Sequence, residues 1–150
     1  MGNKVPFVSS VKKFYDLTHD ELFDIYQARA EVFVVEQNCV YQDFDEYDKQ
    51  AYHIMISDGD NLAAYARIIP AGLKYQEHAI GRVLTLSFAR GKGVGRILME
   101  ACLDCVKRID NGDIRISAQS YLRKFYESYG FEVVGNEYLE DGIPHLEMLR

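Results

Sequence analysis

The sequence contains no tryptophan, only three prolines and only three cysteines among its 150 residues. An odd number of cysteines does not build a disulfide framework. Cys102 and Cys105 fall on the apolar stripe of a predicted helix, where packing explains them better than redox chemistry. No apolar run reaches the roughly 18 residues that a membrane-spanning helix needs, and residues 1–10 hold no run of signal-peptide length. We therefore expect a soluble cytoplasmic protein without a membrane partner.

Positive charge is also scarce. The 17 lysines and arginines are outnumbered by 23 aspartates and glutamates, which leaves a net charge of −6. Nucleic-acid binding depends on clustered positive charge, so no nucleic-acid partner is expected. An amine-bearing or cationic ligand suits the negative electrostatic field of this protein better. The four histidines are scattered without the spacing of metal ligands, and we expect no metal.

The acidic segment Asp43–Asp48 invites comparison with a calcium-binding loop. Such a loop has glycine at its sixth position and glutamate at its twelfth, but this chain has Asp48 and Ile54 there. We interpret residues 37–50 instead as a solvated loop, one that could line a pocket for a positively charged acceptor.

Length and composition favour one globular domain over residues 1–150, because 48% of the residues are hydrophobic and no linker or repeat interrupts the chain. A capping box of Thr18 and Glu21 opens a predicted helix that ends near Glu36. Two further helices are predicted, over 97–109 and from Ser120 to Gly130. Strands are predicted at 11–17, 52–56, 62–69, 79–86, 113–118, 131–134 and 143–149. This order indicates an α/β (α+β) fold, a mixed sheet with helices on both faces.

A glycine-rich turn, Arg90–Gly95, joins a predicted strand to a predicted helix. Glycines let successive backbone N–H groups and the helix dipole converge on an anion, although glycine can also serve only to turn the chain. The turn lacks the Gly-Lys-Ser/Thr ending of a P-loop. It also departs from the Gly-x-Gly-x-x-Gly dinucleotide fingerprint, whose third glycine would fall at Arg96. A small dinucleotide- or phosphate-binding domain is therefore the weaker interpretation.

The turn resembles the Arg/Gln-x-x-Gly-x-Gly/Ala signature of the GNAT N-acyltransferase superfamily, with Arg90, Gly93 and Gly95 in the signature positions. Downstream, 125–131 resembles the family's second signature, an aromatic-Tyr-Glu segment that closes on Gly-Phe. The rest of the chain resembles the ElaA-like branch of the family. That likeness is carried by Arg29, 32–37, Asp45, Asp48, His53, 66–68 and 142–145.

This resemblance implies a GNAT fold, with about seven strands in a mixed central sheet that splays apart in the middle. It implies acetyl-CoA as the acyl donor, with the pyrophosphate on backbone N–H groups of the turn and the pantetheine arm along the preceding strand. The N–H near Val83 would polarise the thioester carbonyl, and Gln119 stands where many relatives carry an asparagine that bonds the pantetheine. The implied cofactor-binding residues are Val83, Leu84, Thr85, Arg90, Gly91, Lys92, Gly93, Val94, Gly95, Arg96, Gln119 and Tyr126.

The candidate catalysts are one acid and three alternative bases. By resemblance, Tyr126 protonates the departing CoA thiolate; the alternative is a core position, because it shares an apolar stripe with Phe125. An attacking amine must also lose a proton, and the candidate bases are Glu36, His53 and His145. The resemblance favours His145, while a structural role is equally open for both histidines.

Arg29 and Glu36 are spaced to share one face of a helix, where they could meet a ligand together or form a partly exposed ion pair. The candidate substrate-binding residues are Arg29, Glu36, His53, Arg67 and His145.

The resulting functional hypothesis is an N-acetyltransferase that moves an acetyl group from acetyl-CoA to a primary amine by direct attack. The acceptor is a small-molecule amine, or the N-terminus or a lysine of a peptide. The alternative is a non-catalytic acyl-CoA-binding or sensing module. Relatives with this fold often form homodimers.

Overall fold

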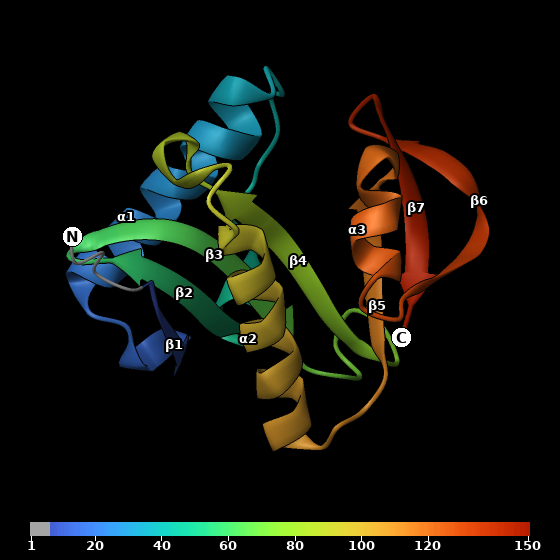
Figure 1. Ribbon diagram of the computed structural model, residues 1–150, viewed down its shortest axis with the longest axis horizontal. Helices are drawn as coiled ribbons and strands as arrows, with labels where there is room; N and C mark the ends of the chain where they lie inside the picture. Colours follow the sequence, from blue (N-terminus) through green and yellow to red (C-terminus); the bar gives the residue numbers. More distant parts are fainter. Residues whose placement is uncertain (1–6) are drawn as a thin grey trace.

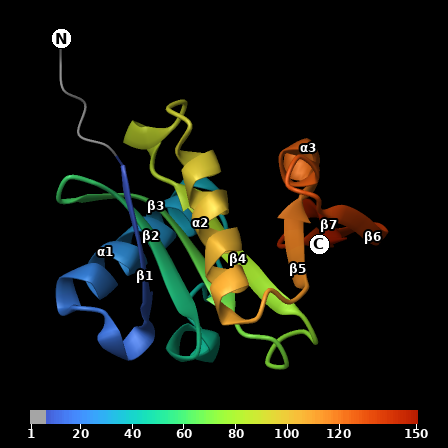
Figure 2. The ribbon, with the colours of Figure 1, turned by 60° about the horizontal axis from the view of Figure 1, so that its bottom comes forward.

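A computed structural model describes residues 7–150, and its ribbon is shown in Figures 1 and 2. Seven strands form one sheet in the order β1-β2-β3-β4-β5-β7-β6. The strands are β1 (Val8–Lys13), β2 (Tyr52–Asp58), β3 (Asn61–Ile69), β4 (His78–Thr85), β5 (Ile114–Gln119), β6 (Glu132–Glu140) and β7 (Ile143–Leu149). All neighbouring strands are antiparallel except β4 and β5, which are parallel. The predicted mixed sheet is confirmed, although its first strand lies earlier than 11–17.

Three α-helices accompany the sheet within these residues: α1 (His19–Arg29), α2 (Val94–Ile109) and α3 (Arg123–Glu127). The predicted capping box is confirmed, because Thr18 accepts from the Glu21 N–H and the Glu21 carboxylate accepts from the Thr18 N–H. Beyond Arg29 the chain continues as a π-helix over Ala30–Glu36, which accounts for the predicted end near Glu36. A π-helix turns less per residue than an α-helix, so side-chain spacings change there.

The two faces of the sheet carry separate cores, because successive strand residues point to opposite sides. Ile54 and Ile56 of β2 pack with Leu98 of α2 in one cluster of buried residues. Met55, between them, packs with Ile25 of α1 in another. The predicted arrangement of helices on both faces is therefore confirmed, as Figure 2 also shows.

The sheet divides between β4 and β5. Their parallel pairing covers only two register pairs, which join His78 to Ile114 and Ala79 to Arg115. Farther along, the two strands separate, and β5 pairs on its other side with β7 (Figure 1). A bulge in β4, where the register to β3 shifts and Arg82 takes a φ of 52°, bends the strand just past the paired end. The bulge and the short pairing together produce the expected splay.

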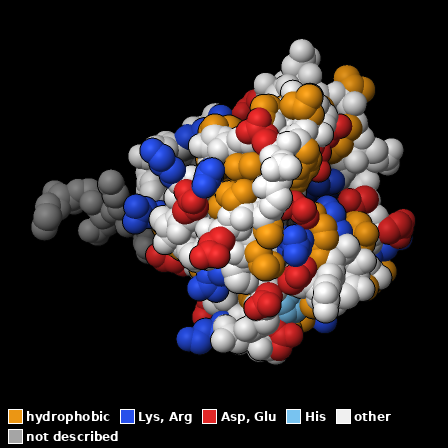
Figure 3. All heavy atoms as spheres, turned by 90° about the vertical axis from the view of Figure 1, so that its right-hand side faces the viewer, with side chains coloured by type: hydrophobic (Ala, Val, Ile, Leu, Met, Phe, Trp, Pro, Cys, Tyr) orange, Lys and Arg blue, Asp and Glu red, His pale blue; other side chains and the backbone are white. Residues whose placement is uncertain are grey.

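None of the helices within residues 7–150 is long and apolar enough to span a bilayer. On the face shown in Figure 3, acidic and basic side chains are interspersed over the surface. That face therefore lacks the continuous positive patch that nucleic-acid binding requires.

Candidate active site

A cavity of about 900 Å³ occupies the gap where β4 and β5 separate. Both diverging strands line it, and its remaining walls come from the π-helix, α3, the loop before β4 and the turn between β6 and β7. Side chains from distant parts of the sequence therefore meet in one place, as an enzyme that joins two substrates requires.

The glycine-rich turn lies at the N-terminus of α2. Gly91 and Gly93 have φ values of 78° and 76°, and Gly93 is the N-cap residue. Glycine adopts this left-handed conformation without the Cβ penalty that other residues meet. Within residues 7–150, the N–H groups of Gly91, Lys92 and Gly93 have no hydrogen-bond acceptor, and the first N–H groups of a helix are unpaired by geometry. The turn thus presents a row of free donors to an anion.

The β4 edge beside the cavity also pairs with no neighbouring strand. The Leu86 N–H donates to the Ala63 carbonyl at 2.9 Å, so Leu86 faces β3. Because ladder hydrogen bonds alternate along an antiparallel pair, the Thr85 N–H faces the gap, whereas Val83 lies in the bulge, where the alternation is interrupted. β5 is already too far away to pair with them, since the register between the two strands ends at Ala79. An extended ligand can therefore add to this edge as a strand does.

Arg90 spans the mouth of the gap. Its Nε donates to the Thr85 carbonyl at 2.9 Å, and its Nη2 donates to Glu36 Oε1 at 2.6 Å. Glu36 therefore meets the glycine-rich turn at the cavity. Its predicted companion Arg29 lies elsewhere, because the π-helix breaks the spacing that would put both on one face.

Tyr126 reaches the cavity from α3. Its ring is 5% exposed and packs edge-to-face against Phe125 and Phe131. Burial raises the pKa of its phenol, which therefore keeps its proton at neutral pH. No side chain or carbonyl among the described residues hydrogen-bonds the hydroxyl, and Tyr126 lines the cavity. The ring of Tyr126 thus packs in the core while the residue borders the cavity, and its role as an acid stays a prediction.

His145 also lines the cavity. It lies on β7, where it pairs with Gln119 of β5. Its Nδ1 lies 2.7 Å from the Ile143 carbonyl oxygen. A carbonyl only accepts, so Nδ1 carries the hydrogen and Nε2 is the atom that can take another proton. Nε2 lies 3.2 Å from Glu140 Oε2, which would pair with the protonated ring. This geometry suits a general base.

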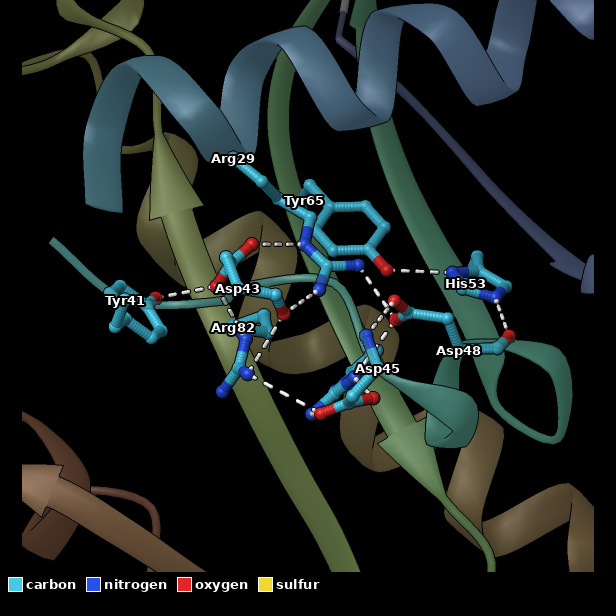
Figure 4. A network of polar contacts seen from close by, with 9 residues as sticks. Arg29, Tyr41, Asp43, Asp45, Asp48, His53, Tyr65 and Arg82 are labelled. Atoms are coloured by element: carbon cyan, nitrogen blue, oxygen red, sulfur yellow. Dashed lines mark hydrogen bonds and ion pairs between the residues drawn. The ribbon is translucent and has the colours of Figure 1, made fainter. Parts of the chain in front are cut away.

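The acidic loop is not solvated as expected. Asp43 and Asp48 are 4% and 1% exposed, and Figure 4 shows them close to Arg29 of α1 and Arg82 of β4. Arg29 pairs with Asp43 at 2.8 Å and with Asp48 at 2.7 Å. Asp48 Oδ1 also pairs with Nη1 of Arg67 at 2.8 Å. The solvated-loop prediction is wrong for Asp43 and Asp48, because the buried Arg29 and Arg67 and the partly buried Arg82 neutralise these carboxylates and hold them inside the fold.

This aspartate–arginine network also takes in Asp45 and Arg82. Arg67 contacts Asp45 at 2.6 Å, and Arg82 contacts Asp43 at 2.7 Å. Burial by itself raises the pKa of Asp48, but the hydrogen bonds and charges of Arg29 and Arg67 outweigh it and lower the pKa. The loop is therefore fixed to the strands that form the cavity.

Two candidate substrate-binding residues lie outside the cavity wall. Arg29 is 0% exposed, and its guanidinium is engaged by Asp43 and Asp48. His53 is also 0% exposed, its Nε2 donates to the Asp48 carbonyl at 2.8 Å, and its Nδ1 accepts from the Tyr65 hydroxyl at 2.6 Å. Burial lowers the pKa of His53, which fits a neutral structural ring. Neither residue is placed to contact a substrate, whereas Arg67 does line the cavity.

Sequence patterns did not single out several other lining residues. Lys74 and Tyr75 come from the loop before β4, Arg82 from the β4 bulge, and Glu140 from the end of β6. No motif links these segments, because only the folded sheet brings them to the cavity.

The aspartate–arginine network predicts a large stability effect for Asp48→Asn. Breaking a buried ion pair typically costs about 3–5 kcal/mol, because the partner charges lose their compensation. We expect the free energy of unfolding, measured with guanidinium or urea, to fall by about 3 kcal/mol. Asp104→Asn is the matched control, since Asp104 pairs with Arg108 on the surface of α2 at 3.0 Å, and we expect less than about 1 kcal/mol there.

The pH dependence of this effect has a definite sign. A depressed pKa stabilises the fold above the ordinary aspartate value of 3.8, and that stabilisation is lost as the pH falls through the folded-state pKa. The deficit of Asp48→Asn relative to the unsubstituted protein should therefore shrink in acid. A deficit that is equal at pH 7 and in acid would contradict the charge-based explanation.

Comparison with known proteins identifies the family of the chain. The family model described as an acetyltransferase (GNAT) domain matches residues 17–150. The chain belongs to the GNAT acetyltransferase family. It is 40% identical to the protein ElaA of Escherichia coli over 146 residues, which cover 92% of this chain and 95% of ElaA.

Solved structures of GNAT proteins share the fold. The crystal structure of an acyl-CoA N-acyltransferase from Pseudomonas aeruginosa matches with a TM-score of 0.92 and 40% identity, covering 97% of this chain and 99% of that one. The crystal structure of E. coli ElaA matches with a TM-score of 0.90 and 37% identity, over the same shares of the two chains. As a member of the ElaA-like branch of the GNAT family, this protein is an acyltransferase, and the cavity between β4 and β5 is its candidate active site.

Proposed function

We propose that the protein transfers an acetyl group from acetyl-CoA to a primary amine by direct attack. The observation that carries this proposal is that one cavity joins an open strand edge to two catalytic candidates, Tyr126 and His145. The acceptor is a small-molecule amine, with a peptide N-terminus or lysine as the other class that fits this chemistry.

Acetyl-CoA binding uses backbone donors in this proposal. The pyrophosphate binds the free N–H groups of the turn, where the α2 dipole adds positive potential. The pantetheine arm pairs with the open edge of β4 and reaches Gln119 on β5. The Val83 N–H, in the β4 bulge, polarises the thioester carbonyl as a fixed donor that needs no reorganisation. The residues that contact the pyrophosphate are Arg90, Gly91, Lys92, Gly93, Val94, Gly95 and Arg96.

The chemical step has two proton transfers. The amine nitrogen attacks the carbonyl carbon while Nε2 of His145 takes the amine proton, and Glu140 pairs with the resulting imidazolium. The C–S bond then breaks, and the Tyr126 hydroxyl gives its proton to the departing thiolate. The products are an N-acetyl amide and free CoA. Glu36 holds Arg90 at the cavity mouth and is the second candidate base.

The test of this function is thiol release. Purified protein with acetyl-CoA and a panel of primary amines should release free CoA thiol, and the acetylated amine should appear in the mass spectrum. Tight CoA binding without turnover of any amine would instead favour the acyl-CoA-binding or sensing module.

Gly93→Asp should weaken CoA binding by at least about tenfold, because it adds a carboxylate beside the pyrophosphate and strains a left-handed residue. Gly93→Asn is the matched control, since asparagine tolerates this conformation and adds no charge. Calorimetry should show a smaller loss for Gly93→Asn. Equal Kd values for CoA in all three proteins would place the pyrophosphate elsewhere.

A further inference from the structure

The loop before β4 brings a lysine to the cavity that makes no ion pair with any described residue. Lys74 lies in the loop between β3 and β4 and lines the cavity, and it has no ion-pair partner among residues 7–150. The residue as a whole is exposed, yet burial around its ammonium group, followed by the charges of Arg67 and Arg82, lowers its pKa. The cationic group therefore stands close to two other cations.

Nearby cations outweigh nearby anions at Lys74, because the charges of Arg67 and Arg82 lower its pKa more than the charges of Glu140 and Asp45 raise it. The three arginines of the aspartate–arginine network face three aspartates, so the network is neutral as a unit. Its members are Arg29, Arg67, Arg82, Asp43, Asp45 and Asp48. Lys74 adds one positive charge beside it, and an anion is the ligand that such a position favours.

The cavity also carries groups of the opposite character. His145 and Glu140 lie 3.2 Å apart and also line the cavity. This pair suits an ammonium or amine group, and Glu140 is among the charges that act on Lys74. The same cavity is thus lined by a lysine cation and by a carboxylate beside a base.

We propose that the acceptor is an amine that also carries a carboxylate, with Lys74 holding the carboxylate while the amine faces His145. This inference rests on the proposed function and names its substrate class. Arg82, whose side chain is partly exposed in the cavity, is a second contact for the same carboxylate. A small amino acid supplies a carboxylate for Lys74 and an amine for His145, whereas a polyamine would bring only positive charge to Lys74.

The first test compares acceptors that differ by one carboxylate: glycine with methylamine, β-alanine with ethylamine, and 4-aminobutanoate with propylamine. A hydrogen bond between charged groups supports a loss of about 10- to 100-fold in kcat/KM for the amino acids when Lys74 becomes methionine. The simple amines should change by less than about twofold, within ordinary surface-substitution effects. Lys107→Met, on the exposed face of α2, is the matched control and should leave every acceptor unchanged. An equal effect of Lys74→Met on both acceptor classes would overturn the inference while the proposed function stood.

A second test does not depend on turnover. Calorimetry measures the binding of N-acetyl-β-alanine and N-ethylacetamide to the CoA-saturated protein. We expect N-acetyl-β-alanine to bind more tightly, and Lys74→Met to remove that preference. If no amine is acetylated but this preference is found, the proposed function fails and the carboxylate site remains. No preference in either protein, or a mass spectrum showing acetyl on Lys74 itself, would overturn the carboxylate site.

Discussion

Replacing Tyr126 by phenylalanine should lower kcat by about 100- to 10,000-fold, the usual contribution of a positioned general acid. The Kd for CoA should stay within about twofold, because the phenyl ring keeps the packing and no backbone donor changes. The expected loss comes from the missing hydroxyl alone. No described residue hydrogen-bonds this group, and burial raises its pKa, so it stays protonated. Steady-state kinetics and calorimetry with CoA measure the two quantities separately.

A packing role for Tyr126 predicts a different result. The edge-to-face contacts with Phe125 and Phe131 survive in the variant, so the melting temperature should hardly move. Tyr129→Phe is the matched control, since Tyr129 packs on Phe125 from the same segment and does not line the cavity. Parallel losses in kcat, CoA affinity and melting temperature would show that Tyr126 acts through the fold instead of as an acid.

The parts of this site that sequence reasoning predicted are those formed by neighbouring residues. The capping box at Thr18 and the left-handed glycines of the turn follow from local rules of backbone conformation, and all are present. The strand predicted at 52–56 is also present, as β2.

The aspartate–arginine network could not be predicted in this way. Asp43 and Asp48 look like a solvated acidic loop until Arg29 and Arg67, from other elements, are known to face them. The π-helix is a second obstacle, because an α-helical spacing wrongly joined Arg29 to Glu36. The first error arises from contacts between segments that are far apart in the sequence, and the second from a local change in helix type that residue spacing does not reveal.

The splay of β4 from β5 explains why the proposed donor and acceptor sites share a cavity. Separation frees the β4 edge for a strand-like ligand and opens room beside β5 and β7. The network matters for the same reason, since it fixes the acceptor wall through Arg67 and Arg82. We therefore expect disruption of the aspartate–arginine network to lower the affinity for the acceptor more than the affinity for CoA.

Replacing His145 by glutamine should lower kcat/KM for the amine by about 100-fold or more at neutral pH, because removal of a general base commonly costs that much. Glutamine cannot take the amine proton, so the reaction must use the small fraction of acceptor that is already deprotonated in solution. Raising the pH enlarges that fraction, and the variant should recover much of its rate. Initial rates measured from pH 7 to pH 10 provide the comparison.

The pH profile separates the base from its alternatives. Tyr126→Phe lacks the acid instead of the base, so the same rise in pH should not restore its rate. Glu140→Gln keeps the imidazole and removes only its carboxylate partner, so its loss should be smaller than that of His145→Gln. A normal rate in His145→Gln together with a pH-rescued loss in Glu36→Gln would transfer the role of base to Glu36, which lines the same cavity beside Arg90.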